Sequence, residues 1–137
     1  MTDAPPRSPR GLRIAWILLG AAVLVWLSFE DQSVRPVLFF AALICGLAAY
    51  SLALRWRLTT RPRSYALPIL GAAAGLAVVP AALFLMVLKS GLHSPLTPDF
   101  TPDQIAWVVT RAPAWGMAGL LAGCAAFLFP LARSGRT

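Results

Sequence analysis

Apolar residues run almost without interruption through four long stretches of this chain, and polar residues gather between them. The stretches cover residues 12–29, 34–54, 66–88 and a fourth that ends near 131. Each reaches the ~18 apolar residues that a membrane-crossing helix needs. Helices are predicted because the runs do not alternate, and because hydrocarbon offers unpaired backbone amides no partner. The expected fold class is all-α, a polytopic membrane protein with four transmembrane helices.

Composition supports a bilayer as the surrounding solvent. Hydrophobic residues make up 58% of the chain, charged residues only 12%, and mean hydropathy is +0.72. A water-soluble domain carries about twice that share of charge. The 137 residues leave only short loops beside the spans, so a single domain over residues 1–137 is expected.

The first span could also be a signal peptide, because basic residues precede its apolar run. Ser28-Phe29-Glu30-Asp31 at its end does not offer the small residues that a peptidase site requires. We therefore expect a retained helix.

Arginines gather at alternate joins between the spans. They are Arg7, Arg10 and Arg13 in the N-terminal tail and at the start of the first span, Arg55, Arg57, Arg61 and Arg63 between the second and third, and Arg133 and Arg136 after the fourth. The other joins carry Glu30, Asp31, Asp99 and Asp103, with Arg35, Lys89 and Arg111. The positive-inside rule then predicts a protein of the cell inner membrane with both termini cytoplasmic.

The formal net charge of +7 raises the possibility of nucleic-acid binding. The arginines, however, fall where membrane topology already requires them, and no basic face stands apart from the spans. Anionic lipid headgroups at the cytoplasmic arginines are therefore the expected partner, and nucleic acid is not.

Small residues recur at helical spacing in three spans. Gly71 and Gly75 form a GxxxG pattern in the third span, Gly119 and Gly123 form another in the fourth, and Ala42 with Gly46 forms a small-xxx-small pair in the second. Such faces let helix backbones approach closely, which matters in lipid because no hydrophobic drive acts between helices. They either close this chain's own bundle or dock on other membrane subunits.

The segment before the fourth span contains a helix start signal. Thr101 at N-cap, Pro102 at the first helical position, and Asp103 and Gln104 in the first turn form a capping sequence. An unbroken helix from there to residue 131 would be ~45 Å long, more than the ~30 Å of hydrocarbon. We therefore expect an outer loop over 89–101, an interfacial helix over 102–112, a bend at Pro113 and a span over 113–131.

Four residues on this outer side are candidate functional groups: His93, Asp99, Asp103 and Arg111. Arg111 either snorkels to a phosphate, pairs with an outer carboxylate, or binds a substrate. His93 is the lone histidine, so it is either solvated or, with the aspartates, able to hold a cation.

Signatures of catalysis are missing from the chain. It has no HExxH, P-loop or GxSxG pattern, and Cys45 and Cys124 have neither CxxC spacing nor a histidine partner. No catalytic, cofactor-binding or metal-ligating residues are predicted. The favoured function is a non-catalytic accessory or assembly subunit. A small transporter or channel for an ion or small solute is the alternative, and an outer-surface enzyme or lipid-binding protein is a third hypothesis.

Overall fold

The computed structural model describes residues 10–29, 33–56, 58, 65–93 and 100–134. These residues form helices and no strand. The helices are α1 (Arg10–Leu27), α2 (Val34–Arg55), α3 (Ala66–His93), α4 (Pro102–Thr110) and α5 (Ala112–Ser134). The predicted all-α fold class is confirmed.

Four helical stretches are long and apolar enough to cross a membrane, namely α1, α2, α3 and the combined run of α4 and α5 up to Phe129. The predicted second span agrees with α2 to one residue. The third differs more, since α3 continues to His93, five residues past the expected end. Lys89 is therefore part of the helix and not of a loop.

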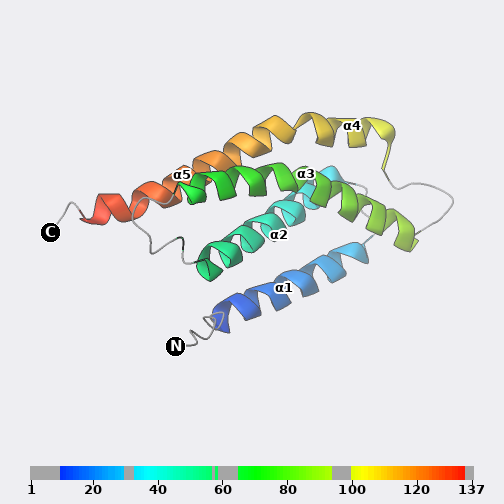
Figure 1. Cartoon of the computed structure of the whole chain (residues 1–137). Coiled ribbons are helices and arrows are strands. Elements are labelled where there is room, and N and C mark those ends of the chain that lie inside the picture. The colour runs from blue at the N-terminus through cyan, green and yellow to red at the C-terminus, as the bar shows by residue number, and fades with distance from the viewer. Residues whose placement is uncertain (1–9, 30–32, 57, 59–64, 94–99, 135–137) are drawn as a thin grey trace.

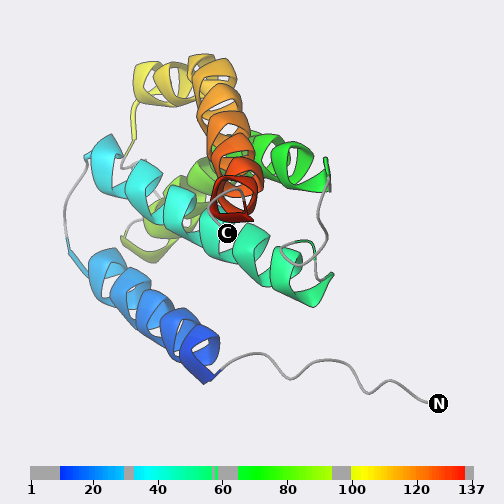
Figure 2. The same ribbon diagram turned by 90° about the vertical axis from the view of Figure 1, so that its left-hand side faces the viewer.

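The helices form an open row, in which each long helix packs mainly on its neighbour in the sequence (Figures 1 and 2). α3 packs most extensively on α5 and next on α2, whereas α1 packs chiefly on α2. No extensive contact joins α2 to α5 or α1 to α5. α1 begins and α5 ends at the end of the row where α2 leads to α3, here called the Arg55 end (Figure 1). The opposite end is the α4 end.

The two edge helices each use one narrow stripe for packing. In α1 the covered residues recur at spacings of three and four, from Leu12 and Ala15 through Leu19 and Val23 to Trp26. In α5 the stripe runs through Gly116, Gly119 and Gly123 to Phe127. That spacing defines a single helix face, so the remaining faces of α1 and α5 meet no other part of the described chain extensively.

The break between α4 and α5 falls at Arg111, two residues before Pro113. A proline deletes the hydrogen bond to the carbonyl four residues earlier and crowds the preceding turn. The chain accordingly tightens there, with the Arg111 amide donating to the carbonyl of Val108 at 3.2 Å. The expected bend and short preceding helix are both present. α3, by contrast, runs unbroken past Pro80, and Figure 1 shows it curving about halfway along.

The main apolar core lies toward the α4 end. It joins the end of α1, the first half of α2, the second half of α3, α4 and the residue Phe100. A smaller cluster at the Arg55 end contains Ala53, Leu58 and Leu67. Between the two clusters the helices are lined by small residues, and the interior is not filled there.

Candidate functional site

The GxxxG patterns of α3 and α5 pack against each other. A Cβ added at Gly75 would overlap the carbonyl of Trp115, and one added at Gly119 would lie 2.9 Å from the Cα of Gly75. A Cβ at Gly71 would likewise lie 3.0 Å from the Cα of Gly123. Separations this short leave no room for any side chain, so backbone meets backbone along this seam. Within the described chain, the four predicted packing glycines close the protein's own fold.

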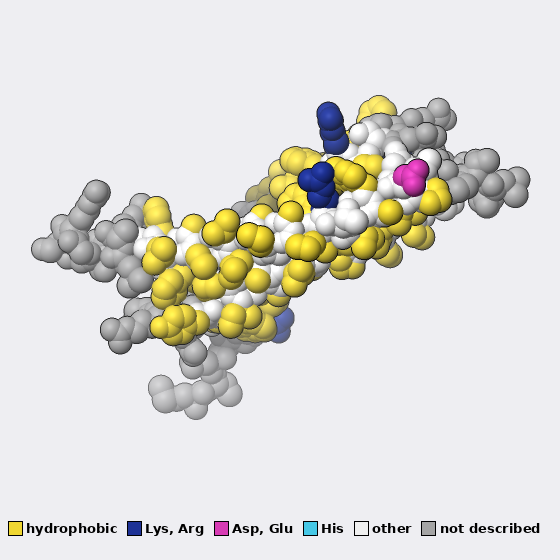
Figure 3. Space-filling model, turned by 90° about the horizontal axis from the view of Figure 1, so that it is seen from above, with side chains coloured by type: hydrophobic (Ala, Val, Ile, Leu, Met, Phe, Trp, Pro, Cys, Tyr) yellow, Lys and Arg dark blue, Asp and Glu magenta, His cyan; other side chains and the backbone are white. Residues whose placement is uncertain are grey.

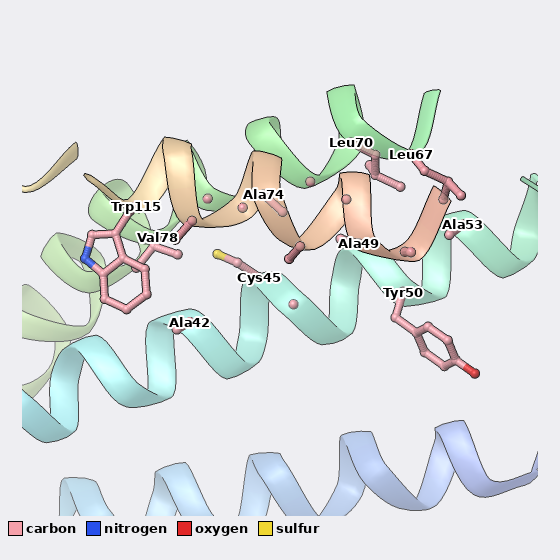
Figure 4. Close-up of a pocket in the computed structure, with 18 residues that line it drawn as sticks. Ala42, Cys45, Ala49, Tyr50, Ala53, Leu67, Leu70, Ala74, Val78 and Trp115 are labelled. Carbon is pink, nitrogen blue, oxygen red and sulfur yellow. The ribbon is translucent and has the colours of Figure 1, made fainter. Parts of the chain in front are cut away.

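A lateral groove lies between α2 and α5, with α3 behind it (Figure 4). Its volume is about 470 Å³, and twelve of its eighteen lining residues are alanine or glycine. Trp115 lies at one end of the groove and Ala53 and Tyr50 lie at the other (Figure 4). Small side chains do not reach across the space between α2 and α5, which explains why the groove stays open.

The small-xxx-small pair of α2 lines this groove, and its glycine makes no close approach to another helix. Ala42 and Gly46 are both lining residues, and a Cβ added at Gly46 would meet nothing within 4 Å. The sequence pattern thus predicts close approach correctly for α3 and α5 but not for α2. Which small-residue face finds a partner depends on how the helices are arranged, and the pattern itself does not specify this.

The predicted capping sequence of α4 is confirmed in every part. The Thr101 hydroxyl accepts from the Gln104 amide at 3.3 Å, and the Gln104 side chain accepts from the Thr101 amide at 2.8 Å. Pro102 occupies the first turn. Phe100, which the sequence reading did not single out, is only 3% exposed and anchors the start of α4 in the core. The sequence indicates this anchor only in that Phe100 is a lone aromatic residue within a polar segment.

The outer-side candidates do not form one described site. Asp103 and Arg111 are both exposed, at opposite ends of α4, and no ion pair joins them. The Arg111 guanidinium lies over the Trp107 ring at 4.6 Å, a cation–π contact. Figure 3 shows charged side chains near the α4 end of a surface that is otherwise largely hydrophobic. Asp99 and the side chain of His93 lie outside the described part.

The buried charge of the described chain is Lys89, a residue that the sequence pattern predicts to lie among the outer loop charges. Its side chain is 1% exposed, and its ammonium lies 4.4 Å from the centroid of the Trp26 ring. Trp26 also packs on Phe40, with ring centroids 5.3 Å apart. The contact ties the end of α3 to the end of α1. The sequence indicates this burial, because the spacing of Val78, Ala82, Leu85 and Lys89 places Lys89 on the buried face of α3.

The described groups offer packing and charge, but little acid–base or redox chemistry. Among the described residues no three His, Cys, Asp or Glu side chains gather as a metal site would require. Cys45 is buried in α2, Cys124 is half-buried in α5, and both are free thiols. No family model, curated protein or solved structure matches this chain.

Proposed function

We propose that this chain is a multi-pass integral membrane protein of the inner membrane, with its two termini in the cytoplasm. Four helices of sufficient length and apolar character support the crossings. The start of α1, the end of α2, the start of α3 and the end of α5 share one end of the row (Figure 1), as alternate crossings require. The same three regions of the sequence carry the arginine clusters, which favour the cytoplasmic side.

Within the membrane, the protein acts as a non-catalytic accessory or assembly subunit. The observation that carries this proposal is the open row of helices, in which α1 and α5 each pack along a single stripe. Helix association in lipid depends on van der Waals packing and interhelical hydrogen bonds, because lipid tails are as apolar as the helices. A row with two incompletely packed edges gains stability when the helices of another subunit complete it.

The edge helix α1 is the surface where a partner would bind. Ile17 and Leu24 are 69% and 68% exposed on the side away from the packing stripe. Besides its apolar contacts, α1 is held by the Trp26–Lys89 contact and by a hydrogen bond from the Trp16 indole to the Ser51 hydroxyl at 3.1 Å. This attachment fixes both ends of α1 and leaves its outer face accessible.

Photocrosslinking in native membranes tests the assembly role. A photoreactive residue at Ile17 should give a defined adduct with another membrane subunit, whereas one at Leu12, 9% exposed, should give none beyond contacts within the chain. A chain that migrates as a lone monomer in mild detergent and forms no adduct from position 17 contradicts the proposal.

A transporter or channel is the second candidate function, and Lys89 is the observation that favours it. An ionisable side chain buried within a spanning helix is costly in free energy and often marks an ion or substrate path. If Lys89 serves transport, proteoliposomes should show flux of protons or monovalent ions that Lys89→Met abolishes, while the exposed-site control Arg35→Gln leaves it unchanged. Absence of any flux in the wild-type protein removes this candidate.

A further inference from the structure

The outer face of α1 carries a ridge of large apolar side chains. Its members recur at helical spacings of three, four and seven residues, which places them on one face, opposite the stripe by which α1 packs. All of them are more than half exposed, and no charged residue interrupts the ridge. The members, here named the α1 ridge, are Ile14, Ile17, Leu18, Leu24 and Val25.

The groove between α2 and α5 has the complementary shape. Alanine and glycine make up most of its lining, and α2 and α5 make no extensive contact across it (Figure 4). Large side chains of one helix pack well where the facing helices present small ones. None of the lining residues is charged, so an apolar ridge would not bury a charge there. The groove therefore fits the α1 ridge in both shape and polarity.

Two contacts between α1 and α2 fix the depth of each residue of α1 relative to α2. The Trp16 indole donates to the Ser51 hydroxyl near the Arg55 end, and the Trp26 ring packs on the Phe40 ring near the α4 end. The two helices run in opposite directions (Figure 1). Ten residues forward along α1 thus correspond to eleven residues back along α2.

The α1 ridge and the groove span the same depth of the protein. The groove lining of α2 runs from Ala42 to Ala53, and by this correspondence it lies level with residues 14–25 of α1, which are the two ends of the ridge. Both surfaces are eleven residue steps long, or ~16 Å at 1.5 Å per residue. Within one chain the ridge faces away from α2, so it can enter only the groove of another copy. Copies inserted with the same orientation present the two surfaces at equal depth.

We propose that the α1 ridge of one copy binds in the groove of a second copy, so that this protein assembles with itself. The inference rests on the proposed function, because it names the partner of the α1 surface. The contact joins two different surfaces of the molecule. Head-to-tail contacts of this kind form a ring when the rotation between copies closes, and an open chain when it does not.

The area of the contact is that of a specific interface. The five ridge side chains, at ~100 Å² each, offer ~500 Å², which is more than half of the ~800 Å² that each partner buries in a standard interface. The groove also adjoins the glycine seam, because Gly71, Gly75, Gly119 and Gly123 are among its lining residues. A ridge bound in the groove would extend the close packing of α3 and α5 to the second copy.

Cysteine crosslinking between two differently tagged copies in native membranes tests this inference. Both copies carry Cys45→Ala and Cys124→Ala, which remove the natural thiols. One copy then carries Ile17→Cys on the ridge, and the other carries Ala49→Cys in the groove, within about one residue of the same depth. An added oxidant such as iodine should join the two tags in a disulfide-linked dimer.

Matched controls vary the face and the depth of the second cysteine. Ala48→Cys lies next to position 49 but is exposed outside the groove, so it should give no dimer with Ile17→Cys. Ala42→Cys lines the groove ~10 Å away along α2 and should also give none. Gly46→Leu enters open space in the groove and should lower the yield of the 17–49 dimer by about tenfold. Leu24→Ala, which shortens the ridge, should lower it as well.

Several results would overturn the inference. They include equal dimer yields from positions 48 and 49, and a 17–49 dimer that neither Gly46→Leu nor Leu24→Ala reduces. Dimers that form only between two copies of Ile17→Cys would show that α1 packs on α1 instead. A photoadduct of position 17 with a different protein, without any dimer, contradicts self-assembly and supports the assembly role. Absence of both adduct and dimer contradicts both proposals, so the two can fail separately.

Discussion

The seam between α3 and α5 and the groove between α2 and α5 are both lined by small residues at helical spacing, yet they have opposite structures. At Gly75 an added Cβ overlaps the Trp115 carbonyl, whereas at Gly46 it meets nothing within 4 Å. The seam uses small residues to bring two backbones together. The groove uses them to keep a space open, so the same sequence pattern serves two different purposes.

The largest effect is expected when the seam is forced apart. Gly75→Ala or Gly119→Ala should lower the free energy of unfolding by ~1–3 kcal/mol, because overpacking a closed contact displaces backbone. Denaturant titration in mixed micelles measures this change. Unaltered stability in both variants would mean that α3 and α5 are not in backbone contact. The seam would then not differ from the groove in how closely its helices approach.

A smaller effect is expected away from the seam, at the start of α4. Thr101→Val removes the acceptor for the Gln104 amide and should cost about 1 kcal/mol, whereas Thr101→Ser should retain the cap. Hydrogen exchange should then accelerate at the Gln104 amide. Faster exchange along α3 and α5 as well would show that the seam depends on α4, contrary to our expectation that the change stays local.

The smallest effect is expected in the groove. Gly46→Ala places a methyl group in open space and should not lower the free energy of unfolding; a rise of up to about 1 kcal/mol is expected, because alanine loses less backbone entropy than glycine in a helix. The same titration applies, with Gly75→Ala measured in parallel. A loss at position 46 as large as that at position 75 would show that α2 and α5 meet closely, and no groove would exist.

Local signals predicted most of the helical structure, because they depend on neighbouring residues alone. Hydropathy located the spans, and the sequence Thr101 to Gln104 located the start of α4 together with its cap. The effect of Pro113 was also foreseen, although the break falls one half-turn earlier, at Arg111. Proline acts on the turn before it, and this accounts for the displacement.

The arrangement of the helices was not predictable, because it depends on contacts between residues far apart in the sequence. The sequence indicates the two GxxxG faces, but it does not indicate that Gly71 and Gly75 meet Gly119 and Gly123. Lys89 was placed among loop charges, since its burial requires Trp26 to lie over it from another helix. The roles of His93, Asp99, Asp103 and Arg111 remain predictions.

The row of helices also bears on how the chain is made. Every long helix packs chiefly on the long helix that precedes or follows it, so few contacts join parts of the chain that are far apart in the sequence. Loop-closure entropy rises with the length of chain that must be ordered, and local topologies form fastest. As synthesis proceeds, each long helix after the first finds the long helix that precedes it already made, and the last, α5, completes the structure by joining its glycines to those of α3.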